Sequence, residues 1–317
     1  MGIISGIYKK AAIHRYDDNG YIKYFSAADF PGLNAEPFSF LSGKNTLRGY
    51  FYSCENCRED ALIIFCHGMG GGHRSYMTEI ELLCRRGYKV LSYDNTGCFD
   101  SDGEDIVCLS QSLADLDAAV AHLKNEGILG KFRNVYVIGH SWGGFAAGNI
   151  ASFHPEIKKA VVIAGFISVK NLLLGVLRGG GAAKDPVINK ILSFEEKAAP
   201  KYRDASFISA VKNSKTKFLF VYSKNDPAVS YKYNAEQIPK AENTQFIIYP
   251  DRLHNPNYTL DAVTYMTKTF ADFNKAKLKL RTLKQKQEFF KSADWIRMTR
   301  QDEDFWQQVT EFLEKNN

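Results

Sequence analysis

The most informative stretch of this chain is Val135-Tyr136-Val137-Ile138-Gly139-His140-Ser141-Trp142-Gly143-Gly144. A β-branched run stops there at a Gly-X-Ser-X-Gly pentapeptide, and small residues follow in Phe145-Ala146-Ala147-Gly148. This order predicts a strand, a sharp turn and a helix that hold Ser141 exposed for nucleophilic attack. Gly139 and Gly143 have a steric role in such a turn, because strand and helix pass too close for a Cβ atom. The pentapeptide alone occurs by chance in many chains, so the prediction depends on the flanking strand and helix.

A serine hydroxyl is a weak nucleophile at neutral pH, so a catalytic serine needs a base, an orienting acid and donors for the oxyanion. The apolar run 61–66 ends in the glycine-rich turn His67-Gly68-Met69-Gly70-Gly71-Gly72. Such a turn aims a backbone N–H, here that of Met69, at the developing oxyanion, and the N–H of Trp142 is the second donor. A nucleotide phosphate loop also has glycines after a strand, but its third glycine position is His73 here. The sequence therefore favours an oxyanion hole.

The base and the acid are expected at the ends of two later strands. The run 217–222 leads into a polar turn that contains Asp226, and the run 245–249 leads into a loop that contains His254. Both side chains would then emerge at the same edge of a parallel sheet as Ser141, in the chain order Ser, Asp, His. An Asp before Pro is usually a turn former and a loop His is usually solvated. Together with the elbow and the glycine turn, however, the three residues predict a catalytic set.

With these motifs the chain resembles the α/β-hydrolase family, and specifically its bacterial esterase, lysophospholipase and serine aminopeptidase-like branch. The resemblance covers most of residues 36–254 and includes Val90-Leu91-Ser92-Tyr93-Asp94-Asn95-Thr96-Gly97, which is followed by Ser101. This branch often carries Asp-X-Arg-Gly-X-Gly-X-Ser there, and Asn95-Thr96 stands in place of the usual residue and arginine. Asp94 precedes the elbow, so we interpret it as structural.

Alternating strand and helix signals predict the fold class, α/β with a doubly wound, mostly parallel sheet. Two strand-like runs, 38–41 and 47–52, predict an antiparallel hairpin at its start. Helical apolar spacing occurs at 77–86, 110–123 and 305–313, and a further strand is expected at 160–164. The resemblance implies an α/β-hydrolase fold with helices on both faces of the sheet, a helical cap and an extended C-terminal helical segment.

The expected organisation is residues 1–165 as the N-terminal part of the core, 166–215 as a cap insertion and 216–317 as the rest of the core with its helical extension. Leu172-Leu173-Leu174, Val176 and Leu177 would form the apolar underside of the cap, beside a joint at Gly179-Gly180-Gly181. The same leucines equally fit an ordinary core helix. About forty-five residues separate His254 from the closing helix, more than simpler members of the family need.

Length and composition are those of an ordinary globular protein, with 317 residues, 45% hydrophobic and 24% charged. Six cysteines lie between positions 54 and 108, without the pattern of a disulfide framework, and the amino terminus lacks a basic region followed by a long apolar core. We therefore expect a cytoplasmic protein. The net charge of +6 is partly local to the tract 275–286, where six cations occur without an acid. A solvated helix face is the commoner outcome for such a tract, and weak contact with an anionic membrane or an acidic partner is the alternative. Nucleic-acid binding is not expected, since a reader motif is absent.

The sequence thus predicts a serine hydrolase, carboxylesterase- or lipase-like, that cleaves a small to medium carboxylic ester through an acyl-enzyme and needs no metal or organic cofactor. Ser141 would be the nucleophile, His254 the general base and acid, and Asp226 the orienting carboxylate. A serine aminopeptidase and a thioesterase or acyltransferase use the same machinery. An aminopeptidase also needs cap carboxylates for the substrate ammonium, for which the candidates are Asp185, Glu195, Glu196 and Asp204. A hydrolase-like protein that binds a ligand or a membrane without turnover is the non-enzymatic alternative, and the oligomeric state is left open.

Overall fold

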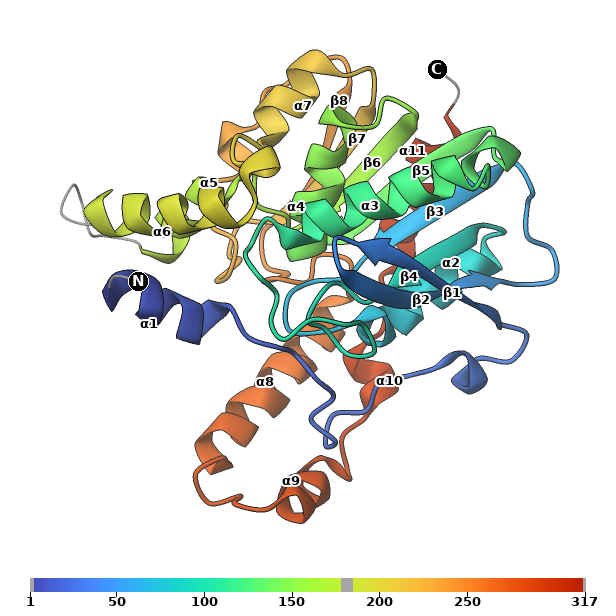
Figure 1. The fold of residues 1–317 in the computed structure, drawn as a ribbon. Coiled ribbons are helices and arrows are strands. Elements are labelled where there is room, and N and C mark those ends of the chain that lie inside the picture. The colour runs from blue at the N-terminus through green and yellow to red at the C-terminus, as the bar shows by residue number, and fades with distance from the viewer. Residues whose placement is uncertain (1–2, 178–184, 316–317) are drawn as a thin grey trace.

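A computed structural model describes residues 3–177 and 185–315, and its centre is one eight-stranded sheet (Figure 1). The strands lie in the order β1-β2-β4-β3-β5-β6-β7-β8. Strands β3 to β8 are parallel, and β1 and β2 form the antiparallel hairpin predicted at the start. The α/β-hydrolase fold expected from the sequence is confirmed. The bounds are β1 Asn34–Ser42, β2 Asn45–Ser53, β3 Ala61–Cys66, β4 Lys89–Tyr93, β5 Asn134–His140, β6 Ile157–Ile163, β7 Lys217–Ser223 and β8 Thr244–Tyr249.

Side chains of the central strands alternate between two apolar layers, because successive residues of a strand point to opposite faces. Leu62 and Ile64 of β3 belong to one core cluster, and Ile63 and Phe65 belong to the other. The first layer is covered by α3 (Gln111–Asn125) and α4 (Trp142–Asn149), and the second by α2 (Met77–Arg85) and α11 (Glu303–Glu314). All six residues of β3 are buried, as expected for a parallel strand with helices on both faces.

Between β6 and β7 the chain forms helices that lie over one end of the sheet (Figure 1). They are α5 (Val169–Val176), α6 (Asp185–Ala198) and α7 (Phe207–Asn213). Leu173 is buried, and Leu172, Leu174 and Leu177 pack against the main core, so these leucines join the body of the protein. Val176 is 63% exposed and does not share that role. The predicted joint Gly179-Gly180-Gly181 lies outside the described residues.

The N-terminal helix α1 (Ile3–Ala12) is attached to α6. The ring of Tyr8 packs edge-on against Phe194 at 5.8 Å, and its hydroxyl donates to Oε1 of Glu195 at 2.6 Å. Glu195 is buried and also accepts the backbone N–H groups of Leu109 and Ser110. One carboxylate therefore ties α1, α6 and the loop before α3 together.

After β8 the chain makes a helical excursion away from the sheet before it returns as α11 (Figure 1). The excursion contains α8 (Leu260–Ala276), α9 (Leu283–Phe290) and α10 (Trp295–Met298). Its two ends are joined, because Tyr258 and Gln301 form an antiparallel bridge and Thr259 N–H donates to the carbonyl of Arg300. Because α8 ends at Ala276 and α9 begins at Leu283, the basic tract 275–286 is not one helix. It contains the end of α8, a turn and the first turn of α9. In the described part of the chain, no helix is both long enough and apolar enough to span a bilayer.

Candidate active site

Ser141 occupies the sharp turn between β5 and α4, with φ 55° and ψ −112°. A positive φ is rare for a residue with a side chain, and such strain is typical of functional positions. The close approach expected at the flanking glycines is present. A Cβ on Gly139 would lie 2.1 Å from the carbonyl oxygen of Gly143, and a Cβ on Gly143 would lie 2.1 Å from that of Cys66. The backbone N–H of Ser141 donates to Ile163 in β6, which fixes the turn to the neighbouring strand.

The structure brings Ser141, His254 and Asp226 into one hydrogen-bonded chain. Nε2 of His254 lies 2.9 Å from Oγ of Ser141, and Nδ1 of His254 lies 2.8 Å from Oδ2 of Asp226. The other carboxylate oxygen of Asp226 accepts the backbone N–H groups of Ala228 and Val229 at 2.8 and 3.0 Å. Asp226 is almost fully buried, whereas the imidazole of His254 keeps 23% of its surface exposed. The carboxylate is therefore fixed in place, and the histidine remains open to a substrate.

The loop that carries His254 is held by the turn that carries Asp226. Oδ1 of Asn225 accepts the N–H of Leu253, and Oγ of Ser223 accepts the N–H of Arg252, both at 2.9 Å. Leu253 has φ 48°, so the residue directly before His254 is strained in the same way as Ser141. Ser223 and Asn225 position the two loops against each other, a role that no sequence pattern had indicated.

The two predicted oxyanion donors have free N–H groups. Among the hydrogen bonds of residues 3–177 and 185–315, neither the N–H of Met69 nor that of Trp142 donates to a protein acceptor. Trp142 is the first residue of α4, where backbone N–H groups lack a partner within the helix. The glycine turn before Met69 is fixed by His67, whose Nδ1 bonds the carbonyl of Gly68 at 2.8 Å and whose Nε2 accepts the N–H of Asn95.

Next to His254 lies a second histidine, His140, in a hydrogen-bonded network that the sequence did not indicate. His140 is buried, and its Nε2 lies 2.8 Å from the main-chain oxygen of His254. Its Nδ1 lies 2.8 Å from the hydroxyl of Tyr76, which in turn accepts the N–H of Gly68. Burial and the neighbouring imidazole of His254 lower the pKa of His140 to about 3. His140 is therefore neutral, with the proton on Nε2, and links the histidine loop to the glycine turn.

The other polar residues of the β4 loop are structural, as expected for Asp94. Asp94 is fully buried and accepts the backbone N–H and Nδ1–H of His73, and it contacts neither Ser141 nor His254. In the unusual pair Asn95-Thr96, the N–H and Oγ1 of Thr96 donate to the buried Asp115. The backbone N–H of Asn95 donates to Nε2 of His67, whereas its buried Nδ2 has no partner among the described residues. Neither position contributes a side chain to the hydrogen-bonded chain of Ser141.

The four candidate ammonium ligands, which lie in the predicted cap insertion, have other environments. Glu195 is buried in the contacts with Tyr8, Leu109 and Ser110, and Asp185, Glu196 and Asp204 are exposed. Glu196 and Asp204 line a hollow of about 250 Å³ together with Lys170 and Arg203, and Asp204 pairs with Arg203 at 3.1 Å.

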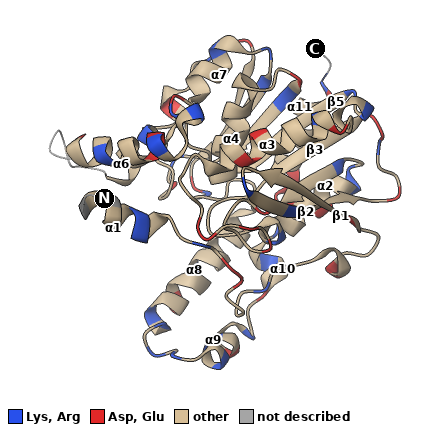
Figure 2. Ribbon diagram, viewed as in Figure 1, with Lys and Arg blue, Asp and Glu red and all other residues tan. Residues whose placement is uncertain are grey.

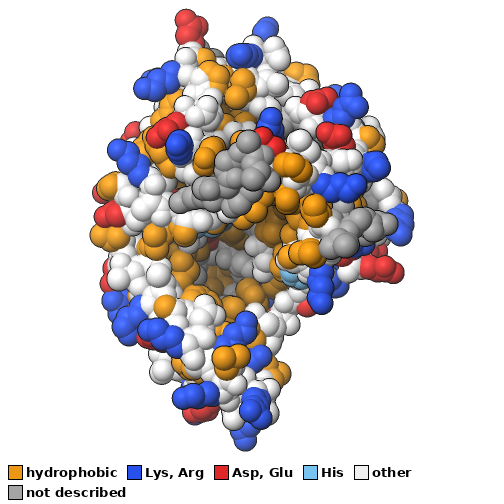
Figure 3. All heavy atoms as spheres, turned by 90° about the vertical axis from the view of Figure 1, so that its left-hand side faces the viewer, with side chains coloured by type: hydrophobic (Ala, Val, Ile, Leu, Met, Phe, Trp, Pro, Cys, Tyr) orange, Lys and Arg blue, Asp and Glu red, His pale blue; other side chains and the backbone are white. Residues whose placement is uncertain are grey.

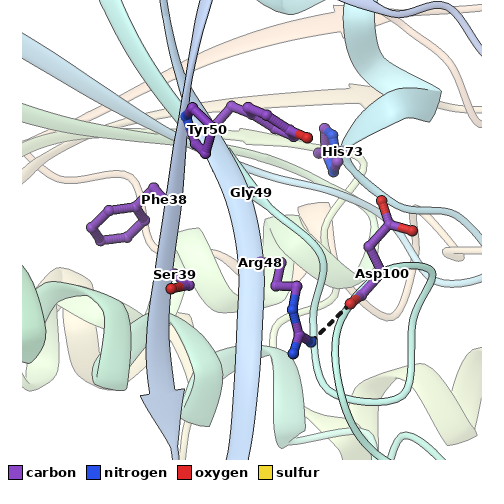
Figure 4. A pocket seen from close by; sticks show the side chains of 8 residues that line it. Phe38, Ser39, Arg48, Gly49, Tyr50, His73 and Asp100 are labelled. Carbon is purple, nitrogen blue, oxygen red and sulfur yellow. Dashed lines mark hydrogen bonds between the residues drawn. The ribbon is translucent and has the colours of Figure 1, made fainter.

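A further hollow of about 410 Å³ lies at the antiparallel hairpin (Figure 4). Tyr50 and His73 lie at one end of it, and Arg48 at the other end donates to the carbonyl of Asp100 at 3.0 Å. None of the five predicted site residues lines this hollow. It is a feature of the hairpin and not of the candidate active site.

Known proteins with similar sequences include peptidases and hydrolases. A proline iminopeptidase from Lactobacillus helveticus is 25% identical over 141 residues, which are 42% of this chain and 46% of that protein. The bifunctional epoxide hydrolase 2 of Rattus norvegicus is 31% identical over 99 residues, which are 31% of this chain and 17% of that protein. The chain thus spans less than half the length of these curated relatives.

Solved structures agree with the fold. An esterase from Pyrococcus furiosus has a TM-score of 0.55 at 19% identity, over 87% of this chain and 97% of that one. Est1E from Butyrivibrio proteoclasticus, solved with ferulic acid bound, has a TM-score of 0.55 at 21% identity, over 75% of this chain and 99% of that one. At these identities the likeness establishes the fold alone.

The family model for serine aminopeptidase, S33, matches residues 58–244, which is more than half of the chain. The match includes Met69, Ser141, Trp142 and Asp226 and ends ten residues before His254. The chain therefore belongs to the serine aminopeptidase S33 family of α/β-hydrolases.

Proposed function

We propose that the protein is a serine hydrolase that cleaves carboxylic esters through an acyl-enzyme on Ser141. The observation that carries the proposal is the unbroken chain of hydrogen bonds from Ser141 through His254 to Asp226, with distances of 2.9 and 2.8 Å. Three side chains from loops far apart in the sequence meet in the geometry that activates a serine hydroxyl.

The first half of the reaction forms the acyl-enzyme. Oγ of Ser141 attacks the ester carbonyl carbon while its proton passes to Nε2 of His254. The carbonyl oxygen becomes an oxyanion, which the N–H groups of Met69 and Trp142 stabilise by about 3 kcal/mol for each donor. The His254 imidazolium then protonates the leaving alcohol.

The second half of the reaction hydrolyses the acyl-enzyme. His254 deprotonates a water molecule, which attacks the acyl carbon, and the return of the proton to Ser141 releases the acid.

Asp226 and His140 keep His254 in the state that this cycle requires. The carboxylate of Asp226 accepts from Nδ1, so Nε2 of His254 is free to accept the serine proton. His140 lies 4.9 Å from His254, ring centre to ring centre, and a charge there would oppose the imidazolium. Because its low pKa keeps His140 neutral, that repulsion does not arise.

An ester is favoured over a peptide because the cap offers no unengaged buried carboxylate among its candidate residues. Glu195, the only buried one of the four, accepts three protein donors. A substrate ammonium would have to compete with those donors. The family description and the likeness to a proline iminopeptidase favour the second candidate, a serine aminopeptidase.

Labelling with a fluorophosphonate probe tests the nucleophile. We expect the wild type to be labelled and Ser141→Ala to be unlabelled, with a loss of turnover of several orders of magnitude. Ser209→Ala, a change at an exposed serine in α7, is the matched control and should label as the wild type does. Absence of labelling in folded wild-type protein would instead favour a ligand-binding protein without turnover.

A substrate series separates the two enzymatic candidates. We expect p-nitrophenyl esters from acetate to palmitate to be hydrolysed with a maximum at one acyl length, and proline p-nitroanilide to be a poor substrate. A higher kcat/KM for the anilide than for every ester would reject the esterase proposal in favour of the aminopeptidase. An acyl-coenzyme A thioester in the same series tests the thioesterase.

A further inference from the structure

We propose that the tip of the C-terminal excursion docks on an anionic lipid bilayer. This tip, residues 277–284, joins α8 to α9 and projects from the body of the protein (Figure 1). It combines two exposed leucines with four cations that have no acidic partner among residues 3–177 and 185–315. The inference concerns a surface remote from Ser141 and does not depend on the proposed reaction.

The leucines of the tip are exposed to an unusual degree. Leu278 keeps 89% of its surface accessible and Leu283 keeps 51%. Leu278 is the most exposed of the large hydrophobic side chains in the described ranges. A single exposed leucine is ordinary, but two on one projecting turn form a surface that an apolar medium stabilises.

The cations of the tip differ from the neighbouring ones in their pairing. Lys268 and Lys275 of α8 both pair with Asp272 of the same helix. Lys291, which follows α9, pairs with Glu288 in that helix. Across the described chain, by contrast, no carboxylate pairs with the tip cations Lys277, Lys279, Arg281 and Lys284. All four are exposed, and Figure 2 shows basic residues along this part of the excursion. Four uncompensated positive charges on one turn attract an anionic surface.

At the base of the tip, a cluster of aromatic rings holds α8 against α9. Phe273 of α8 lies 4.8 Å from Phe290 of α9, and Tyr21 stacks on Phe290 at 5.8 Å. Nε2 of Gln287 also donates to the carbonyl of Gly20. The two helices that carry the tip are therefore held in place relative to each other, which limits the conformational entropy lost by the backbone on binding.

The tip lies on the same side of the molecule as α1 (Figure 1). Figure 3 looks onto this side and shows a hollow, lined by hydrophobic side chains, between the lower and upper parts of the molecule. Ile4 and Ile7 of α1 are further exposed apolar residues, and Ile7 is 65% accessible. A bilayer that contacts the tip would thus face other apolar side chains as well.

The alternation of leucines and cations in the tip fits a lipid surface better than an acidic protein. Lysine and arginine can pair with lipid phosphates while the intervening leucines enter the boundary of the acyl chains. An acidic polypeptide would use the charges and leave Leu278 and Leu283 in water.

Vesicle sedimentation tests the proposal directly. Wild-type protein is mixed with sucrose-loaded vesicles of phosphatidylcholine, alone or with about 30% phosphatidylglycerol, at about 0.05 M and about 0.5 M salt. We expect binding only to the anionic vesicles and a clear loss at high salt. Replacement of all four tip cations by glutamine should weaken binding by about 100-fold or more, since each contributes about fivefold.

A matched variant separates local from overall charge. Lys44, Lys212, Lys215 and Lys240 are also exposed, but they lie in the hairpin turn, in or after α7 and before β8. Their joint replacement by glutamine gives the same net charge and should leave most of the binding. Leu278→Ser with Leu283→Ser should weaken binding at both salt concentrations. Circular dichroism of each variant verifies folding.

Three results would overturn the proposal. They are wild-type protein that stays in the supernatant with anionic vesicles at low salt, equal losses in the two glutamine variants, and unchanged binding in the leucine variant. Binding to polyglutamate as tight as that to vesicles would likewise overturn it, in favour of an acidic protein partner.

Discussion

His140 donates a hydrogen bond from Nε2 to the main-chain carbonyl of His254 over 2.8 Å, although the two residues are 114 positions apart. The bond joins the residue before the proposed nucleophile, Ser141, to the backbone of the proposed base, His254. Tyr76 extends the connection to the N–H of Gly68, next to the predicted oxyanion donor Met69. One chain of contacts thus positions the base relative to the oxyanion loop, and the relative positions of these groups determine the rate of acyl transfer.

Tyr76→Phe should reduce kcat by about 10-fold to 100-fold and change KM little, because it removes only the hydroxyl that connects His140 to Gly68. The measurement is ester hydrolysis by purified variants over a range of pH. Tyr136→Phe is the control, since Tyr136 is a buried tyrosine that lies in β5 outside this network. A Tyr76→Phe enzyme with the kcat of the wild type would show that the network has no part in positioning His254.

Asp226→Asn should lower kcat by roughly 10⁴-fold with little loss of stability. The amide keeps the shape of the carboxylate, but it neither selects the Nδ1–H tautomer of His254 nor stabilises the imidazolium. Steady-state hydrolysis and thermal unfolding measure the two effects separately. Asp251→Asn, at an exposed aspartate in the loop of His254, is expected to match the wild type in both. Full activity in Asp226→Asn would assign the orienting role to another group.

Glu79 should make stability depend on pH. It is buried beneath the histidine loop, where Oε1 accepts from Asn257 at 3.1 Å, and desolvation raises its pKa from 4.5 to about 7. Between these values the folded protein binds a proton that the unfolded chain does not, so stability falls as pH rises. Glu79→Gln stays neutral throughout. Relative to the wild type, its free energy of unfolding should increase by about 3 kcal/mol from pH 4.5 to above pH 7.

Denaturant unfolding of both proteins at several pH values provides the measurement for Glu79. The exposed Glu59→Gln is the control and should follow the wild-type curve. A constant difference in stability between Glu79→Gln and the wild type across that range would contradict the raised pKa.

Lys159 should be a major contributor to the anchoring of α11. Its buried ammonium group donates to the carbonyl oxygens of Phe312, Leu313 and Lys315, at 2.6 to 3.1 Å. Lys159→Met keeps the apolar stem but leaves those acceptors without a donor, and it should cost about 2–4 kcal/mol of unfolding free energy. Lys158→Met changes the exposed neighbouring lysine and should cost much less. Equal losses in the two variants would reject the capping role.

The core sheet was predictable from sequence because its signals are local. β3 is a run of six buried apolar residues, and the elbow at Ser141 has its glycines where the backbone requires them. The order of Ser141, Asp226 and His254 along the chain predicted their meeting, because strand ends in a parallel sheet share one edge.

The supporting residues were not predictable in this way. Tyr76 and His140 are 64 positions apart, and no local pattern indicates that a phenol and an imidazole will meet. Glu195 was considered as a substrate ligand, yet its position on α6 faces the backbone of Leu109. The interruption of the basic tract, in contrast, had a signal. Thr282 and Gln285 have the spacing of a capping box, and the structure has that box at the start of α9.

The joined ends of the excursion, at the bridge between Tyr258 and Gln301, make it a loop that leaves and re-enters the body at neighbouring points. Its other contacts include those of Gln287 with Gly20 and of Phe290 with Tyr21. Chain length between two fixed neighbouring points adds only logarithmically to the entropy of closure, so a change in the length of this segment costs little closure entropy. Mutation can therefore alter the proposed lipid-docking tip while His254, four residues before Tyr258, keeps its place. Grafting a shorter hairpin between Tyr258 and Gln301 would yield a trimmed enzyme, and the same junction would accept an unrelated targeting module.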